Sequence, residues 1–312
     1  MRALIIGAAG FVGSYLTEHL QKESGWSVSA TKLPQEDCSL LGAELYDLDI
    51  LDKDSVKALM DKLMPDCVFH LAAQSSVALS WKRPQLTVDV NIKGCVNVLE
   101  AVRQAGAKTR VLLIGSSEEY GAVREAENPV SEERALHPVN IYAAAKACQN
   151  MLGTIYAGAY GMDILMVRAF NHIGPGQAPA FAAADFCRQT AKIERGMQEP
   201  VIRTGNLSVK RDFTDVRDIV CAYAALMQRG IAGETYNVGS GRAIAIRELL
   251  EEIIGLSNAA IRIETDPDKF RPADVPVVEA DIRKLERDTG WVRRYELKDT
   301  LKDMLEYWRG KV

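Results

Sequence analysis

The sequence predicts an α/β protein, with a doubly wound parallel sheet and a smaller C-terminal α/β lobe. Short, continuously apolar runs alternate with longer amphipathic runs through the first half of the chain. Strands of this kind, joined by helices, are typical of a parallel sheet that is covered on both faces. After Arg168 the alternation loosens at a Gly/Pro-rich stretch, NHIGPGQAPA, where we expect the second lobe to begin.

The expected elements follow the apolar periodicity in chain order. In the first half, strands are expected at residues 3–6, 28–30, 68–71, 111–114 and 164–167, and helices at 11–22, 55–63, 86–105 and 142–160. Beyond residue 168, helices are expected at 181–195, 216–228, 282–289 and 297–308, with strands at 201–203 and 234–240. A ligand is expected in the cleft between the lobes, at the carboxyl ends of the strands.

Composition and charge argue against several classes of function. The 312 residues carry a net charge of −4 with no run of Lys and Arg, so neither nucleic acid nor an anionic membrane is an expected partner. No apolar run approaches the ~18 residues of a membrane span, and the glycine-interrupted N-terminus does not resemble a signal peptide. The six cysteines form no CxxC pair and the four histidines show no ligand spacing. We therefore expect a cytoplasmic protein without disulfides or a metal site.

Three glycines stand at the junction between the first expected strand and the first expected helix. In LIIGAAGFVGSYL, Gly7, Gly10 and Gly13 surround Phe11 and Val12. Glycines at such a junction allow a tight turn and let the backbone approach a pyrophosphate at the helix N-terminus. The alternative is a glycine-rich turn without a ligand. We expect a dinucleotide-binding domain at residues 1–168, with 216–241 returning to it, and a substrate lobe at 169–215 and 242–312.

The end of the second expected strand bears on the choice of dinucleotide. An acidic residue there would bind the ribose 2′-hydroxyl of NAD(H), but the sequence has Thr31 and Lys32. A cation suits the 2′-phosphate of NADP(H), whereas a solvated loop lysine is the alternative interpretation. We therefore expect NADP(H), with NAD(H) as the alternative cofactor.

Tyr142 and Lys146 lie four residues apart on an expected helix and so share one face. An ammonium near a phenol favours the phenolate and would lower the pKa of Tyr142 from ~10. The phenol could then donate and accept a proton near neutral pH. The same spacing also occurs by chance. Ser116, which follows an apolar run in IGSSEEYG, completes a Ser/Tyr/Lys set downstream of the glycines.

Together these residues resemble the extended short-chain dehydrogenase/reductase family, which binds dinucleotides on a Rossmann fold. The segments FHLAAQSSV, IGSSEEYG, YAAAKA, FNHIGPGQ, GNLSVKRDFTDVRDIV and RPADVP extend the resemblance along nearly the whole chain. They are similar to the branch that handles GDP-mannose derivatives, and within it to the GDP-4-keto-6-deoxy-D-mannose reductases, which make GDP-D-rhamnose. The resemblance implies a GDP-linked keto-deoxy sugar as substrate and a homodimer that packs through the helix carrying Tyr142.

The resemblance also implies roles for individual residues. Tyr142 would give a proton to the C4 oxygen as the keto group is reduced, and Ser116 would hydrogen-bond that oxygen. Lys146 would hold the nicotinamide ribose, and Glu118 would hold a sugar hydroxyl. Cofactor contacts are implied for Gly7, Gly10, Phe11, Val12, Gly13, Thr31, Lys32, Asp49, Ile50, Leu71, Ala72, Ala73, Tyr142, Lys146, Phe170 and His172. Substrate contacts are implied for Gln74, Ser75, Ser117, Glu118, Asn171, Val201, Arg211, Arg271 and Asp274.

The neighbouring GDP-mannose 4,6-dehydratases are the first alternative. They have Thr-Ser-Glu where this chain has Ser116-Ser117-Glu118, and their Glu helps to remove the C5 proton and expel the C6 hydroxyl. Their Arg-rich loop after Asn-His is absent, because NHIGPGQAPAFAAADF carries no cation before Arg188. We therefore favour the reductase. A 4-epimerase, which reuses the Ser/Tyr/Lys set, is the second alternative, and the intact set argues against a non-catalytic dinucleotide sensor.

Overall fold

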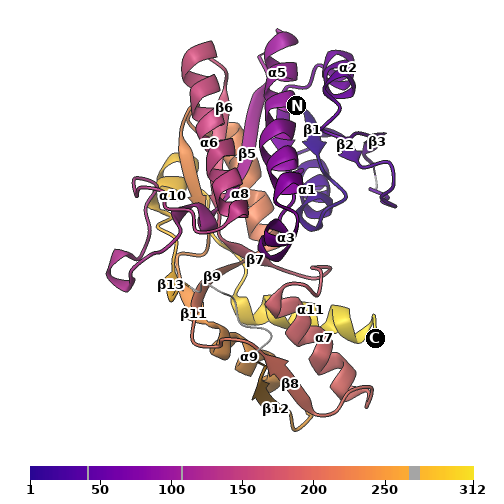
Figure 1. The fold of residues 1–312 in the computed structure, drawn as a ribbon. Coiled ribbons are helices and arrows are strands. Elements are labelled where there is room, and N and C mark those ends of the chain that lie inside the picture. Colours follow the sequence, from indigo (N-terminus) through magenta and orange to yellow (C-terminus); the bar gives the residue numbers. More distant parts are fainter. Residues whose placement is uncertain (41, 107, 267–274) are drawn as a thin grey trace.

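A computed structural model of the chain describes residues 1–40, 42–106, 108–266 and 275–312, which form two lobes (Figure 1). The larger lobe contains a seven-stranded sheet in the order β10-β6-β5-β4-β1-β2-β3, with every neighbouring pair parallel. The strands are β1 (Arg2–Ile6), β2 (Ser27–Lys32), β3 (Glu44–Asp47), β4 (Cys67–His70), β5 (Arg110–Ser116), β6 (Ile164–Ala169) and β10 (Thr235–Val238). The predicted α/β class with a parallel sheet is confirmed, although β3 is not among the expected strands.

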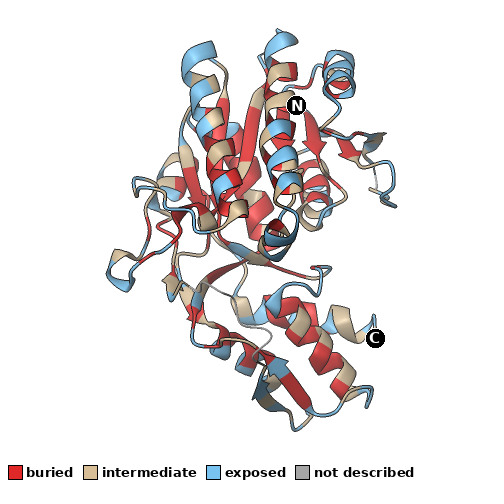
Figure 2. Cartoon of the chain, viewed as in Figure 1, coloured by how far each residue is buried: buried red, intermediate tan, exposed pale blue. Residues whose placement is uncertain are grey.

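Helices cover both faces of this sheet. On one face lie α1 (Phe11–Lys22), α8 (Val216–Arg229) and α10 (Arg283–Thr289), and on the other lie α2 (Lys53–Leu63), α5 (Gly94–Gln104) and α6 (Ile141–Tyr160). The central strands are buried along their length, as Figure 2 shows. Because burial of each large apolar side chain contributes ~1.5–3 kcal/mol, the two layers between sheet and helices form the main core.

The prediction of one continuous helix at residues 86–105 is wrong in the middle of that range. The structure has α3 (Val77–Lys82), α4 (Pro84–Val88) and a π-helical turn, η1 (Asp89–Lys93), before α5 begins. The turn carries Asn91 into the interior, where its Oδ1 accepts a hydrogen bond from Gln74 N at 2.8 Å and its Nδ2 donates to Gln74 O at 3.0 Å. Such turns are common at functional sites, and this one anchors the loop that follows β4.

The smaller lobe packs α7 (Ala182–Glu194), α9 (Ile246–Gly255) and α11 (Leu297–Arg309) around its own apolar core. Its short strands are β7 (Asn171–Ile173), β8 (Val201–Thr204), β9 (Lys210–Asp215), β11 (Ala243–Ala245), β12 (Arg262–Thr265) and β13 (Val277–Val278). Between these segments the chain returns to the larger lobe, where α8 packs against α1 and β10 pairs with β6. Helix α9 is not among the expected elements, although its apolar residues recur at helical spacing.

The structure also bears on membranes and metals for the part of the chain that it describes. No helix there combines the length and the apolar character needed to cross a membrane. The same residues contain no cluster of His, Cys, Asp or Glu that could hold a metal ion. All six cysteines are free thiols.

Candidate active site

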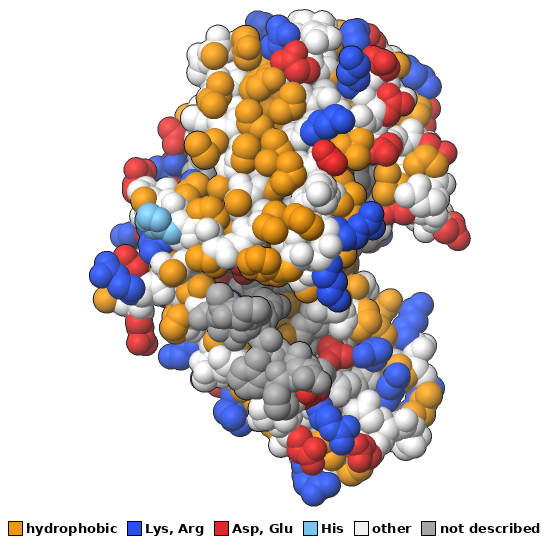
Figure 3. Space-filling view, in the orientation of Figure 1, with side chains coloured by type: hydrophobic (Ala, Val, Ile, Leu, Met, Phe, Trp, Pro, Cys, Tyr) orange, Lys and Arg blue, Asp and Glu red, His pale blue; other side chains and the backbone are white. Residues whose placement is uncertain are grey.

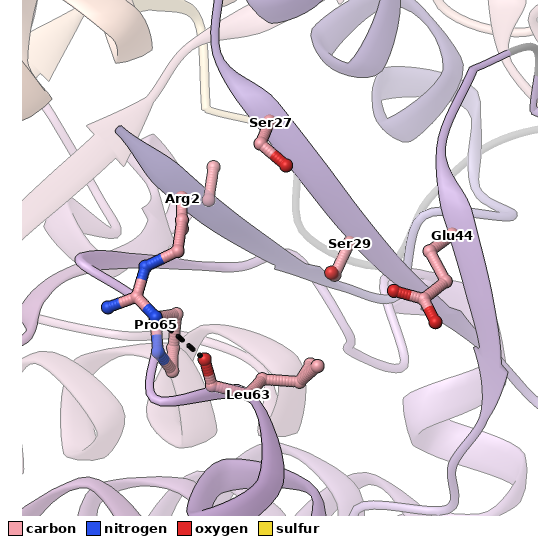
Figure 4. A pocket seen from close by; sticks show the side chains of 7 residues that line it. Arg2, Ser27, Ser29, Glu44, Leu63 and Pro65 are labelled. Carbon is pink, nitrogen blue, oxygen red and sulfur yellow. Dashed lines mark hydrogen bonds between the residues drawn. The ribbon is translucent and has the colours of Figure 1, made fainter.

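The carboxyl ends of the parallel strands lie at one edge of the sheet and bring distant segments together. There β1 leads into the glycine turn, and β5 ends at Ser116, level with the end of β6. A shallow pocket beside Arg2 and Glu44 lies at the opposite edge, where β1 and β3 begin (Figure 4). Arg2 is already paired with Asp66 there, at 3.1 Å. We therefore place the candidate site at the carboxyl edge.

Two of the three glycines after β1 are required by the protein itself. Gly7 has a φ of +86°, and a Cβ there would lie 2.6 Å from Cα of Ala72. A Cβ on Gly13 would lie 2.2 Å from the carbonyl oxygen of Ala8. No side chain fits at these distances, so the turn between β1 and α1 can close only with glycine at both positions.

Gly10 differs, because the protein leaves room for a side chain there. Its φ is −70°, and among the described residues a Cβ would approach only Gly7 O, at 3.5 Å. Gly10 is also the N-cap of α1, and it has no side chain to pair with the first N–H groups of the helix. Open space beside uncapped helix N–H groups suits a pyrophosphate, so these residues fit a dinucleotide cofactor.

The first turn of α1 packs against the segment that leads into the smaller lobe. The Phe11 ring stacks on the His172 ring, with centroids 6.2 Å apart and planes 5° apart. His172 Nδ1 lies 3.2 Å from Phe170 O, and burial lowers the pKa of this imidazole, so the ring is neutral at pH 7. Three predicted cofactor residues therefore lie together, and Val12 packs beside them against the core.

The end of β2 carries the residues predicted to select the dinucleotide. Thr31 is buried, and its Oγ1 accepts a hydrogen bond from Gly7 N at 3.1 Å, so its hydroxyl holds the glycine turn. Lys32 Nζ pairs with Asp47 Oδ1 at 2.7 Å, and the lysine side chain is 17% exposed. The end of β2 itself has no acidic residue, but the neighbouring strand β3 places the carboxylate of Asp47 beside Lys32.

The loop after β4 runs beside the glycine turn. Leu71 N and Ala72 N both donate to Ile6 O, at 2.9 and 2.8 Å. This double contact brings the loop to the Cα of Gly7. The other predicted cofactor residues of the region are Ala73, which is half-buried, Asp49, which is exposed, and Ile50, which is buried.

Ser116 and Tyr142 meet at the end of β5. Tyr142 lies in the first turn of α6, which Asn140 caps by accepting a hydrogen bond from Ala143 N at 2.8 Å. Burial raises the pKa of Tyr142 above its ordinary value, although the neighbouring Ser116 hydroxyl favours the ionised phenol. The expectation that Lys146 lowers the pKa of this phenol is therefore wrong for the protein alone, because the loss of water around the phenol outweighs its favourable contacts.

Lys146 lies one turn further along α6 and is buried. Its Nζ donates to Ile114 O at 2.7 Å and to Gln149 Oε1 at 3.2 Å. Burial lowers the pKa of Lys146 to about 8, and the nearby carboxylate of Glu119 partly opposes that shift. An ammonium has three N–H donors, so one remains for a ligand, as the predicted ribose contact requires.

The two carboxylates of IGSSEEYG have separate environments. Glu118 is half-buried, and its Oε2 accepts a hydrogen bond from Asn140 Nδ2 at 3.0 Å. Glu119 is enclosed and accepts hydrogen bonds from Ser116 N at 2.8 Å and from Asn150 Nδ2 at 3.0 Å. Glu118 can meet a ligand, whereas Glu119 cannot, because protein surrounds its carboxylate.

The predicted substrate residues near the sheet differ in exposure. Asn171 and Ser75 are exposed and Ser117 is half-buried, so their side chains are accessible to a ligand. Gln74 turns inward, where its Nε2 donates to Thr87 Oγ1 at 2.8 Å. Its amide therefore holds the loop after β4 in the structure.

Two predicted substrate residues of the smaller lobe, Val201 and Arg211, are less accessible. Val201 lies in β8 at 2% exposure, so protein encloses its side chain. Arg211, in β9, donates from Nη1 to Val275 O at 2.7 Å. Arg271 and Asp274 lie outside the described residues. The roles of these four residues stay predictions.

Sequence reasoning missed most of the polar groups that hold the site together. Asn140 stands directly before α6, so its position as a helix cap could have been read from the sequence. Three of the others are buried amides whose partners are mostly distant in sequence, and the fourth is Glu119, whose spacing of three from Ser116 is the pattern of a capping box. The amides are those of Asn91, Gln149 and Asn150.

Known proteins share this architecture along its whole length. A family model described as GDP-mannose 4,6 dehydratase matches residues 4–304. The chain is 35% identical to GDP-6-deoxy-D-mannose reductase of Pseudomonas aeruginosa, over 100% of this chain and 98% of that one. It is 29% identical to GDP-mannose 4,6 dehydratase 2 of Arabidopsis thaliana, over 97% and 86%. The solved structure of RMD from Pseudomonas aeruginosa complexed with NADPH is 34% identical, with a TM-score of 0.90 over 100% of this chain and 99% of that one.

Alanine at Gly7 should affect mainly stability, whereas alanine at Gly10 should affect mainly cofactor binding. Gly7→Ala forces a side chain to a φ of +86° and against Ala72, so we expect a loss of at least ~2 kcal/mol and a fall in Tm of at least ~4 °C. Gly10→Ala should change the Tm by less than ~1 °C but weaken dinucleotide binding, because its methyl group would occupy the open space. Thermal unfolding and fluorescence titration with NADPH measure the two effects. Equal destabilisation by both substitutions would contradict this distinction.

Proposed function

The chain belongs to the GDP-mannose 4,6 dehydratase family, and we propose that within it the protein is an NADPH-dependent reductase that converts GDP-4-keto-6-deoxy-D-mannose to GDP-D-rhamnose. The observation that carries the proposal is the similarity to a reductase of this class, which extends over the full chain. A 4,6-dehydratase, which has Thr at the position of Ser116, and a nucleotide-sugar 4-epimerase, which reuses the Ser/Tyr/Lys set, are the alternatives.

The protonation state of Tyr142 is compatible with the proposed reduction. Burial raises the pKa of this phenol, so it is protonated near neutral pH and can give a proton. Reduction of a carbonyl needs a proton donor beside the carbonyl oxygen. Tyr142 can therefore supply the proton that the proposed reduction needs.

The residues of the site have separate tasks in the proposed reaction. Bound NADPH would supply the hydride to C4. Tyr142 gives its proton to the C4 oxygen, and Ser116 hydrogen-bonds the same oxygen, since the two hydroxyls already meet. Lys146 keeps one N–H for the cofactor ribose. Glu118 accepts a hydrogen bond from a sugar hydroxyl on the oxygen that Asn140 leaves open.

We propose that the two lobes divide the ligands between them. Residues 1–168 with 216–241 would hold the dinucleotide, and the glycine turn and α1 support this assignment. Residues 169–215 and 242–312 would hold the nucleotide sugar, where a guanidinium such as that of Arg211 suits a diphosphate. The six free thiols support a cytoplasmic location.

Two reactions distinguish the proposed reductase from a dehydratase. With GDP-4-keto-6-deoxy-D-mannose, the wild type should oxidise NADPH in proportion to the GDP-D-rhamnose formed. With GDP-mannose alone, it should form no keto sugar. A dehydratase would form it without net use of cofactor, because its hydride returns to the sugar. NADPH absorbance and product NMR measure both reactions, and conversion of GDP-mannose without net NADPH consumption would overturn the proposal.

Glu118→Gln sharpens the same test. In a reductase, Glu118 only binds a sugar hydroxyl, so kcat/KM should fall about tenfold, the scale of one weakened hydrogen bond. In a dehydratase it is a working acid/base, and the loss should reach about 10²–10⁴-fold. Tyr142→Phe is the control, because either mechanism loses its proton-transfer group and should slow by about 10²–10⁴-fold with cofactor still bound. A Glu118→Gln loss as large as the Tyr142→Phe loss would indicate the dehydratase.

Lys32 is proposed to select NADPH over NADH while Asp47 competes for its ammonium. Lys32→Ala should weaken NADPH binding about tenfold and change NADH binding by less than about twofold. Asp47→Asn is the matched variant, since it frees Lys32 and removes a charge that repels the 2′-phosphate. It should tighten NADPH binding about two- to fivefold. Fluorescence titration of the wild type and both variants with each cofactor measures these affinities. An equal effect of Lys32→Ala on both cofactors would show that Lys32 only forms its ion pair with Asp47.

We propose a homodimer that forms through α6. On this helix Met151, Ile155 and Tyr160 are 60%, 55% and 56% exposed, and Figure 3 shows hydrophobic side chains gathered on the face where α5 and α6 lie. Contiguous apolar patches mark association surfaces. A two-fold axis would pack this patch against its own copy, which is the commonest arrangement for soluble oligomers.

Light scattering tests the dimer. The wild type should have twice the 34.3 kDa chain mass, and Met151→Lys combined with Ile155→Glu should reduce it to the single-chain mass. Met197→Lys is the control, because Met197 is as exposed, at 62%, but lies in the smaller lobe. It should leave the dimer intact. A monomeric wild type, or a double variant that stays dimeric, would refute this interface.

A further inference from the structure

The carboxylate of Glu119 joins three elements of the larger lobe. Its Oε1 accepts hydrogen bonds from Ser116 N at 2.8 Å and from Asn150 Nδ2 at 3.0 Å. Its Oε2 accepts from Asn150 Nδ2 at 3.0 Å and from Arg168 Nε at 3.3 Å. The residue is 0% exposed. A buried carboxylate is tolerated when it is both paired and hydrogen-bonded, and this one ties the end of β5 to α6 and β6.

Gly115 makes room for this carboxylate on the strand. A Cβ there would lie 2.2 Å from Glu119 Oε1 and 2.3 Å from Asn150 Nδ2. Gly115 is not among the glycines with a positive φ. The position therefore requires the absence of a side chain, not an unusual backbone conformation. The sequence thus places glycine directly before Ser116 so that the carboxylate can reach the Ser116 N–H.

The same contact sets the direction of the Ser116 hydroxyl. Ser116 caps the 3₁₀ turn η2 (Ser117–Tyr120), where its Oγ accepts a hydrogen bond from Glu118 N at 3.2 Å while Glu119 holds its N–H. This reciprocal arrangement is a capping box. Because Oγ accepts from Glu118 N, its single proton stays free to be donated. The hydroxyl is left beside Tyr142.

We propose that Glu119 is a positioning residue for the reduction: its buried carboxylate fixes the main chain of Ser116, and thereby the Ser116 hydroxyl, for the C4 oxygen of the sugar. Glu119 touches neither sugar nor cofactor and moves no proton. The inference rests on the proposed function, because that function assigns Ser116 to the C4 oxygen. It adds a residue that acts through Ser116 to Tyr142 and Ser116, which are proposed to face the C4 oxygen.

A double-mutant cycle with Ser116 tests the inference. Glu119→Gln removes the charge and weakens the bond to Ser116 N, so kcat for keto-sugar reduction should fall about tenfold in the enzyme that keeps Ser116. In the Ser116→Ala background no hydroxyl remains to be positioned, so the same substitution should lower kcat by less than about twofold. KM for both substrates should change by less than about twofold. A role in folding alone would give the same factor in both backgrounds.

Glu127→Gln is the matched control. Glu127 closes a similar turn, η3 (Glu125–Glu127), by accepting a hydrogen bond from Arg124 N at 2.8 Å, and it pairs with Arg134 at 3.1 Å. Its carboxylate contacts neither β5 nor α6, so kcat should be unchanged. If the Glu119→Gln variant does not fold, the Asn150→Ala variant is tested in its place. This substitution removes a hydrogen-bond donor to Glu119, while Arg168 still pairs with the carboxylate. We then expect about a threefold fall in kcat with Ser116 present and none in the Ser116→Ala background.

The outcomes separate this inference from the proposed function. Equal factors in the two backgrounds, for Glu119→Gln or for Asn150→Ala, would overturn the positioning role and leave the reductase assignment intact. A wild type that does not oxidise NADPH with the keto sugar would overturn the proposed function, and the inference with it. Coupling to Ser116 in an active wild type, with unchanged KM, would support both.

Discussion

The parallel register of β5 and β6 is the constraint on which the candidate site depends. Ser116 lies level with Ala169, so β6 delivers Phe170 and Asn171 beside the end of β5. Because the sheet is covered on both faces, a slip of one residue would turn Ser116 to the opposite face and is not tolerated. Helix α6 packs on the same two strands and carries Tyr142 to their carboxyl ends. The geometry of the candidate site therefore depends on the register of these strands more than on loop conformation.

Most of the larger lobe could be predicted from the sequence because its signal is local. The glycine turn, the continuous apolar strands and the amphipathic helices each show within a few residues, and α1 occupies Phe11–Lys22 as its periodicity indicates. Strand β3 is half-exposed and short, so its four residues form a strand only because β2 offers a partner. The π-helical turn likewise depends on the pairing of Asn91 with Gln74, which spacing along one segment does not reveal.

The candidate site could be predicted only where its residues lie on regular elements. The pair Tyr142 and Lys146 follows from helical spacing, and Ser116 from the end of an apolar run. Glu118 and Glu119 look alike in sequence, and only packing shows that one is accessible and the other enclosed. The direction of the pKa shift of Tyr142 was missed for the same reason, because it depends on how much water the fold removes.

The buried network at the end of β5 continues into the smaller lobe. Tyr120 donates to Asn237 Oδ1 at 2.7 Å, and Asn237 Nδ2 donates to Asp281 O at 3.3 Å. Beside that contact, the carboxylate of Asp212 accepts main-chain hydrogen bonds from residues 240, 241 and 280. Asp212 follows Arg211 in β9, so the arginine proposed to meet the diphosphate stands next to a residue that main-chain hydrogen bonds hold in place. Separation of the two lobes would leave several of these buried groups without hydrogen-bond partners. These hydrogen bonds therefore oppose movement of the smaller lobe relative to the larger one.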